Sequence, residues 1–350
     1  MEVNRERIMN ALRTVQEPEL GQDLATLGMV EDVRVDGQTV TLKINLTTPE
    51  SPLKDDIERE IRQAVIREAG QVDLQVEFGS KVRGPQKEPM PGVRTVIAVG
   101  SGKGGVGKST VAANLAASLA LEGAKVGMLD ADIYGPSQSK MFGVEGKRLM
   151  ADDEKRILPL RNHGVKVISI ANLVEDGQAL TWRGPILHGT LTQLLNQTTW
   201  GELDYLIVDL PPGTGDVQLS LVQLVGVTGM VLVTTPQDMA LVDVRRAYTM
   251  ARKTHVPILG VVENMSYYQL PDGTRDYIFG EGGAKRWAEE EKLPLMGQIP
   301  ITRALRESGD GGTPLVILDP SNPSAQELRR TARITAGQIG IQSMSSLPMA

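Results

Sequence analysis

The sequence predicts an α/β protein whose main domain is a doubly wound, mostly parallel sheet, with a small α+β domain before it. From Arg94 onward, apolar strand-like runs alternate with helical segments, an order typical of parallel strands joined by right-handed crossovers. A glycine-rich turn, Gly102 to Ser109, follows the first of these runs and leads into a helix-like segment. The first 80 residues show a different pattern, in which a hairpin lies between two helices.

Residues 1–80 form the predicted small domain. Apolar residues recur at helical spacing over residues 3–15 and 52–69, alternate as in a hairpin around Asp36-Gly37, and end in a strand at 72–78. We interpret Glu17-Pro18-Glu19 as a turn that ends the first helix, with a partner-binding surface as the alternative. Residues 81–93 hold three prolines and two glycines, which predicts an extended linker.

The main domain is predicted to span residues 94–342, followed by a flexible tail at 343–350. Because its strands are continuous apolar runs, helices should cover both faces of the sheet. Ligands of such sheets bind beyond the carboxyl ends of the strands. The expected strands are residues 95–99, 125–129, 165–170, 205–209, 230–234, 258–263 and 295–299.

Composition excludes several kinds of site. The chain of 350 residues has no cysteine, so it cannot form disulfides, thiolate nucleophiles or thiolate metal sites. Its formal charge is −6 and it has no block of five or six Lys and Arg residues, which argues against a nucleic-acid partner. Charges near the start argue against a signal peptide, and polar interruptions within residues 217–233 argue against a membrane span. We therefore expect a cytoplasmic protein without a membrane partner.

Residues Gly102 to Ser109 read GKGGVGKS and match the phosphate-binding loop pattern between a strand and a helix. The glycines let consecutive backbone N–H groups turn around an anion, and the N-terminus of the following helix adds positive potential. Lys108 should reach the β and γ phosphates of a nucleotide, and the Ser109 hydroxyl should bind Mg²⁺. The predicted nucleotide-binding residues of the loop are Gly102, Gly104, Gly105, Val106, Gly107, Lys108, Ser109 and Thr110.

Polar residues follow three other predicted strands. Asp130 and Asp132 end one strand on the same face, where hard oxygen ligands suit Mg²⁺ and its water shell. Asp130 is expected to bind the metal through water or to support its ligands, and a capping role for one of the two aspartates is the alternative. Asp209 ends an apolar strand in the Walker B arrangement and should hold a Mg²⁺-bound water, while Gly213 could offer its N–H to the γ phosphate. Asn264 follows a later strand, and its amide can match the edge of adenine.

An additional lysine within the loop, Lys103, resembles the deviant Walker A class that includes MinD, ParA, the nitrogenase iron protein and the Mrp-type iron–sulfur carriers. The resemblance implies that Lys103 reaches the nucleotide of the second subunit in a homodimer and acts there much as an arginine finger does. A solvated loop lysine is the alternative. The resemblance also implies that Asp132 positions or activates the attacking water and that Asn264 selects ATP. Lys103 and Asp132 are therefore the expected catalytic residues.

Three further stretches are similar to the Mrp branch. The sequences QEPELGQDLATLGMVEDVRV and LTTPESPLK resemble the small domain that accompanies iron–sulfur assembly proteins. The tetrad Trp182-Arg183-Gly184-Pro185 matches one in Mrp-type carriers. The resemblance implies an ATPase that acts in cluster assembly or transfer through ATP-dependent dimer switching, with iron–sulfur assembly or target proteins as partners.

The chain departs from the Mrp pattern at the cluster ligands. The resemblance implies a Cys-x-x-Cys pair shortly after the asparagine motif, and Leu270 and Gly273 occupy the corresponding positions. Neither can bind iron, and iron–sulfur clusters need soft ligands. Two functions therefore remain open. One is an ATPase that assists cluster transfer with thiolates supplied by a partner, and the other is an ATP-switched scaffold or adaptor that handles no cluster.

Overall fold

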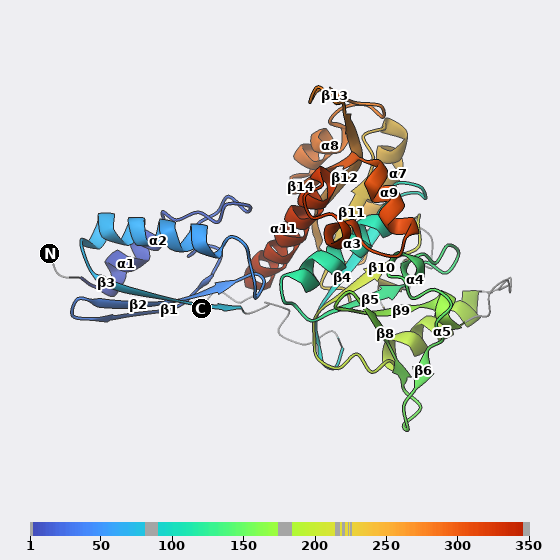
Figure 1. Cartoon of the computed structure of the whole chain (residues 1–350), viewed down its shortest axis with the longest axis horizontal. Helices are drawn as coiled ribbons and strands as arrows, with labels where there is room; N and C mark the ends of the chain where they lie inside the picture. Colours follow the sequence, from blue (N-terminus) through green and yellow to red (C-terminus); the bar gives the residue numbers. More distant parts are fainter. Residues whose placement is uncertain are drawn as a thin grey trace. The chain divides into compact units, whose positions relative to one another are not determined.

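The computed structural model describes residues 3–80, 90–173, 184–213, 218, 221, 222, 224 and 226–345. The chain divides into two compact units (Figure 1). Unit 1 contains residues 1–83 and 336–350, and unit 2 contains residues 84–335. The last helix, α11 (Pro323–Ser345), contributes its two ends to different units. The end of the predicted main domain at 342 and the predicted tail from 343 therefore differ from the division that the structure shows, and most of the predicted linker lies outside the described residues.

Unit 1 has the pattern of helices and strands that the sequence predicts. Its elements are α1 (Arg5–Leu12), β1 (Val30–Asp36), β2 (Thr39–Leu46), α2 (Lys54–Ala69) and β3 (Asp73–Ser80). Strands β1 and β2 form the expected antiparallel hairpin, and β3 pairs parallel to β2.

Buried apolar side chains of both helices and of the sheet form the core of unit 1. They include Ile8 and Leu12 of α1, Leu42 of β2, and Ile57 and Ile61 of α2. The predicted turn after the first helix is also present, because the buried Glu17 side chain accepts the backbone N–H groups of Glu19 and Leu20.

Unit 2 is built around a nine-stranded sheet, and the seven predicted strands form its parallel part. Strand β4 (Val93–Ser101), which carries the glycine-rich loop, lies between β10 (Leu203–Asp209) and β11 (Gly229–Thr234) in the middle of this part. In spatial order the parallel strands are β14 (Leu295–Ile301), β12 (Ile258–Gln269), β11, β4, β10, β5 (Val126–Asp130) and β9 (Val165–Ser169).

Short antiparallel strands border this sheet and were not predicted. They are β13 (Arg275–Asp276), which pairs with β12, and β8 (Leu160–Asn162), which pairs with β9. A separate two-stranded hairpin consists of β6 (Met150–Ala151) and β7 (Ile157–Leu158). These strands have two or three residues and no long apolar run, so the sequence gives no periodic signal for them.

Helices cover both faces of the sheet, as expected for a doubly wound fold. One buried cluster joins alternate strand residues, such as Val96 and Ala98, to α5 (Gly184–Asn196), α7 (Asp238–Lys253) and α8 (Gly283–Glu291). The strand residues that alternate with these, such as Ile97 between Val96 and Ala98, are equally buried. They point to the opposite face of the sheet because strand side chains alternate. Helix α3 (Lys108–Leu121), which is buried on nearly all sides, lies against β4, β5 and β10.

The remaining helical segments of unit 2 whose bounds the structure describes are short. They are α4 (Gln138–Met141), the 3₁₀ helix η1 (Ile170–Leu173), α9 (Arg303–Asp310) and α10 (Leu315–Leu318). Within the described part of the chain, none of the helices combines the length and the apolar character that a membrane crossing requires.

Replacement of Ile61 by Ala should destabilise unit 1 by about 2–5 kcal/mol, because Ile61 is fully buried in α2 and its truncation leaves a cavity. Ile66→Ala on the exposed side of the same helix is the matched control and should change stability by about 0.5 kcal/mol or less. Hydrogen exchange of the β2 amides in the full-length chain at increasing urea measures both effects. Equal effects of the two substitutions would contradict the packing described here.

Candidate functional site

The glycine-rich loop joins the end of β4 to the start of α3 in unit 2. Gly105 and Gly107 have φ angles of 83° and 81°, in the left-handed region that favours glycine. A Cβ atom at Gly102 would lie 2.1 Å from the backbone of Asp243 in α7, so the loop also needs glycine for close packing. The conformation therefore depends on the glycine positions that the sequence pattern identified.

Lys108 is the first residue of α3, and only 5% of its side chain is exposed. Its Nζ lies 2.5 Å from Oδ1 of Asp209 and 3.6 Å from Oδ2 of Asp132. It also lies 3.2 Å from the Ser109 hydroxyl. Ions that are removed from water need close partners, and two carboxylates supply them here. The lysine predicted to bind phosphate is thus paired with aspartates that the sequence placed in the same site.

Asp209 is fully buried at the end of β10, between the ends of β4 and β5. In the sheet register it lies beside Asp130, and this pairing brings the predicted Walker B aspartate next to the aspartates that follow β5. While Oδ1 of Asp209 faces Lys108, Oδ2 accepts a hydrogen bond of 2.8 Å from Nε2 of Gln138. Gln138 was not predicted as a site residue, because a single glutamine after a Gly-Pro-Ser turn has no distinctive spacing.

The carboxylate of Asp130 organises the loop that follows β5. Its Oδ1 accepts the N–H of Asp132 at 3.2 Å. Its Oδ2 accepts the N–H groups of Ser137 and Gln138 and the hydroxyl of Ser169, each at 2.9 Å. These contacts occupy most of the lone pairs of the Asp130 carboxylate. They therefore favour a role in supporting the metal ligands over direct coordination of the metal by Asp130.

Burial raises the pKa of Asp130 to about 7, and the negative charge of Asp209 adds to this rise. The hydrogen bonds from Gln138 and Ser169 and the charge of Lys108 act in the opposite direction. Gln138, Ser169 and Lys108 favour the ionised form of Asp130, so they offset part of the rise in pKa that burial causes.

Asp132 lies nearer to solvent than the other two aspartates, although only 7% of it is exposed. Its Oδ1 accepts the N–H of Gly135 at 3.2 Å, and its Oδ2 is the oxygen that faces Lys108. The predicted catalytic carboxylate is therefore close to Lys108, the lysine predicted to bind phosphate.

Asn264 and Gly213 approach the phosphate loop from other elements. Asn264 is buried on β12, and its Nδ2 donates to the carbonyl of Val106 at 2.9 Å. The N–H of Gly213, whose φ is 100°, donates to the carbonyl of Ser101 at 3.1 Å. The structure therefore brings both predicted residues to the loop, where each donor has a protein acceptor.

Lys103 occupies a half-buried position in the same loop. Its carbonyl accepts the Ser101 hydroxyl at 3.0 Å. Its ammonium forms no ion pair or hydrogen bond with the residues that the structure describes, unlike that of Lys108. Thr110, the remaining predicted loop residue, lies in the first turn of α3, and its carbonyl accepts the side chain of Asn114.

The positions of the missing cysteines lie in the hairpin between β12 and β13. Leu270 is partly exposed, its N–H donates to Thr274, and its carbonyl accepts the N–H of Gly273. In the described ranges, no group of three or more His, Asp and Glu side chains is placed to hold a metal ion. The hairpin therefore offers no ligand set for a cluster. Trp182 and Arg183 of the predicted tetrad lie outside the described residues.

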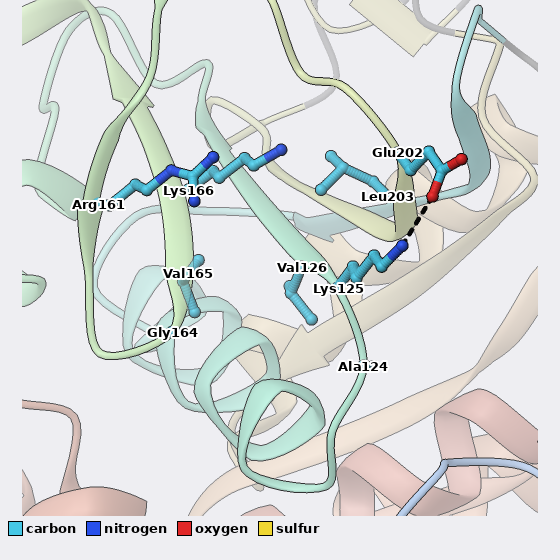
Figure 2. A pocket seen from close by; sticks show the side chains of 9 residues that line it. All are labelled: Ala124, Lys125, Val126, Arg161, Gly164, Val165, Lys166, Glu202 and Leu203. Carbon is cyan, nitrogen blue, oxygen red and sulfur yellow. Dashed lines mark hydrogen bonds and ion pairs between the residues drawn. The ribbon is translucent and has the colours of Figure 1, made fainter.

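A cavity of about 520 Å³ lies at the amino ends of β5, β9 and β10 (Figure 2). The parallel strands therefore separate it from the phosphate loop, which is at their carboxyl ends. Its lining includes an ion pair between Lys125 and Glu202 with a distance of 2.7 Å. None of the predicted site residues lines it.

A glycine-rich loop between a strand and a helix, with a buried lysine facing aspartates at the ends of neighbouring strands, defines a P-loop NTPase site. Comparison with solved structures supports this class of protein. The nucleotide-binding protein of Archaeoglobus fulgidus in complex with ADP is 43% identical, with a TM-score of 0.57 over 63% of this chain and 87% of that chain. The septum site-determining protein MinD of Pyrococcus horikoshii in complex with Mg-ADP is 25% identical, with a TM-score of 0.53 over 68% and 94%.

Sequence comparison identifies the family within this class. Residues 92–335 match the family described as NUBPL iron-transfer P-loop NTPase, and residues 5–78 match iron–sulfur cluster assembly protein. The iron–sulfur cluster carrier protein of Deinococcus radiodurans is 53% identical over 97% of both chains. That of Escherichia coli strain K12 is 42% identical over 97% of this chain and 93% of the relative. The chain belongs to the iron–sulfur cluster carrier family of P-loop NTPases, as the motifs predicted.

Gly107→Ala should destabilise unit 2 more than Gly105→Ala, although both glycines have a similar positive φ. The backbone strain should be about 1–2 kcal/mol in each variant. Only at position 107 would the new Cβ meet another residue, because it would lie 2.1 Å from Nδ2 of Asn264 and displace that side chain from Val106. Hydrogen exchange of the β4 amides in urea measures the difference. Equal stabilities of the two variants would contradict the contact between the loop and Asn264.

Proposed function

We propose that this chain binds and hydrolyses ATP with Mg²⁺ as a homodimer, and that this cycle drives a step of iron–sulfur cluster assembly or transfer in the cytoplasm. The observation that carries the ATPase is the buried lysine of the phosphate loop facing two carboxylates at the carboxyl edge of the sheet. Membership of the carrier family supports the cluster pathway. In the proposal, residues 1–80 serve as the accessory assembly domain and the P-loop domain carries the ATPase.

In this proposal, the phosphates of ATP replace the carboxylates as partners of Lys108. The glycine N–H groups and the N-terminus of α3 surround the phosphates. Gly213 exchanges its bond to the Ser101 carbonyl for the γ phosphate, so the loop after β10 takes a second position that depends on that phosphate. Asn264 contacts the adenine through the part of its amide that does not bind Val106.

The donor groups beside Lys108 suit Mg²⁺, because the Ser109 hydroxyl and the Asp209 carboxylate are hard oxygen ligands. Ser109 would bind the ion directly, while Asp209 and Asp130 would act through water. Mg²⁺ supplies positive charge that offsets the charge of the transferring phosphoryl group. Asp132 orients the attacking water, and Lys103 adds positive charge at the nucleotide of the second subunit. The ammonium of Lys103 has no partner among the described residues, and this supports that last role.

The catalytic roles can be separated by substitution. Lys108→Ala should abolish ATP binding. Asp132→Asn should retain binding but slow hydrolysis by about 10²–10⁴-fold, because it removes a group that acts on the water. Lys103→Ala should retain nucleotide and slow hydrolysis by about 10³-fold or more, as loss of an arginine finger does. Nucleotide binding and phosphate release measure these effects. Hydrolysis at the parental rate by Lys103→Ala would contradict its role.

A mixture of Lys103→Ala and Asp132→Asn proteins tests whether Lys103 acts on the second subunit. Each mixed dimer contains one complete site, so an equal mixture should recover roughly a quarter of the parental rate if pairing is random. A mixture that stays as slow as its separate components would show that both residues act within one subunit.

The lack of cysteine favours a second candidate for the cluster-related function. In the first candidate, a partner protein supplies the thiolates and this chain supplies the ATP-dependent switching of the dimer. In the second, the chain is an ATP-switched scaffold or adaptor that handles no cluster. Leu270 and Gly273 stand where Mrp-type carriers have the Cys-x-x-Cys ligands, so neither candidate includes a cluster held by this chain alone.

Anaerobic reconstitution of the purified chain with iron and sulfide should yield no stoichiometric cluster, because the chain has no thiolate ligand. Iron and sulfide analysis together with the visible absorption spectrum measure the outcome. A variant with Leu270→Cys and Gly273→Cys provides the positive control, since it restores the pair expected from the family. A stoichiometric cluster in the parental chain would contradict the ligand argument.

A further inference from the structure

Gln138 joins the phosphate loop to the end of β10. It is the first residue of α4, and none of its surface is exposed. Its Nε2 donates to the carbonyl of Ser109 at 3.0 Å and to Oδ2 of Asp209 at 2.8 Å. One amide group therefore contacts the backbone of Ser109, whose hydroxyl we propose as a direct magnesium ligand, and the carboxylate of Asp209, which we propose to act on the ion through water.

The chemistry of these contacts fixes the orientation of the Gln138 amide. A carbonyl and a carboxylate oxygen only accept hydrogen bonds, so the nitrogen must face them and Oε1 must point elsewhere. That Oε1 is buried and has no hydrogen-bond partner among the residues that the structure describes. A buried acceptor without a partner costs about 1–3 kcal/mol. The site therefore contains an oxygen that requires a donor from outside the described chain.

The surroundings of Gln138 indicate what this donor is. Ser109 and Asp209, its two partners, provide the oxygen ligands proposed for Mg²⁺, and Mg²⁺ keeps several of its waters when proteins bind it. Such waters are strong donors, because the ion polarises them. A neighbouring amide oxygen is a suitable acceptor for one of them.

We propose that Gln138 is a positioning residue for the magnesium ion, which holds Asp209 through Nε2 and accepts a hydrogen bond from a metal-bound water through Oε1. This inference rests on the proposed nucleotide function. When Lys108 turns to the phosphates, Oδ1 of Asp209 loses its partner. The hydrogen bond from Gln138 to Oδ2 then keeps the carboxylate in place, so Oδ1 is available to the hydrated ion.

The test compares Gln138→Met with Lys140→Met. Methionine fills a similar volume without the amide, and Lys140 is an exposed residue of the same short helix. The affinity of Mn²⁺ for the full-length chain with ADP is measured by electron paramagnetic resonance, and the affinity of ADP is measured separately in the presence of a chelator. Gln138→Met should weaken Mn²⁺ binding by about 10–100-fold, the usual effect of removing a partner of a metal ligand. It should leave metal-free ADP binding unchanged, and Lys140→Met should alter neither affinity.

An unchanged Mn²⁺ affinity in a folded Gln138→Met chain would overturn the inference. An equal loss of metal-free ADP affinity would also overturn it, since it would show a general structural role. Gln138→Ala provides a second variant if the methionine variant does not fold, and the same outcomes apply. If the parental chain binds ADP and Mn²⁺ but the variants do not differ from it, only this inference fails. If the parental chain binds no nucleotide, the proposed function fails with it.

Discussion

The buried ion pair between Lys108 and Asp209 is the interaction on which the rest of the site depends. Lys108 begins α3 and Asp209 ends β10, so the pair connects the phosphate loop to the neighbouring strand. Removal of one partner from a buried pair leaves an uncompensated charge and typically costs about 3–5 kcal/mol. The fold tolerates Lys108 in this position because carboxylates from two neighbouring strand ends surround it.

The same arrangement explains how the site can respond to a nucleotide. Lys108, Gly213 and Asn264 each donate to a protein oxygen, and each would need to exchange or share that partner with ATP under the proposed function. Such an exchange couples phosphate binding to the loop after β10 and to β12. Lys103 differs from these residues, because its ammonium has no partner within the part of the chain that the structure describes. That difference is consistent with a role at a second subunit.

Much of the fold could be predicted from the sequence, because the seven parallel strands are continuous apolar runs and the phosphate loop has a distinctive spacing. The short strands β8 and β13 could not be predicted, since they depend on pairing with β9 and β12 rather than on their own pattern. Helix α11 continues to Ser345, whereas the sequence predicted a flexible tail from residue 343.

The candidate site could also be predicted only in part. The start of α3 and the ends of β5 and β10 bring Lys108, Asp132 and Asp209 together as the motifs implied, although their proposed roles in ATP hydrolysis stay predictions. The contacts of Asp130 with its own loop and the bridge made by Gln138 could not be predicted, because both depend on how residues 131–138 fold back over the ends of β5 and β10.

The most direct test of the central claim is a crystal structure with Mg²⁺ and a non-hydrolysable ATP analogue. The account predicts that Lys108 Nζ moves from Asp209 to the β and γ phosphates, while the Asp209 carboxylate stays in place and its Oδ1 faces the hydrated ion. A structure in which the nucleotide is bound and Lys108 still pairs with Asp209 would contradict it.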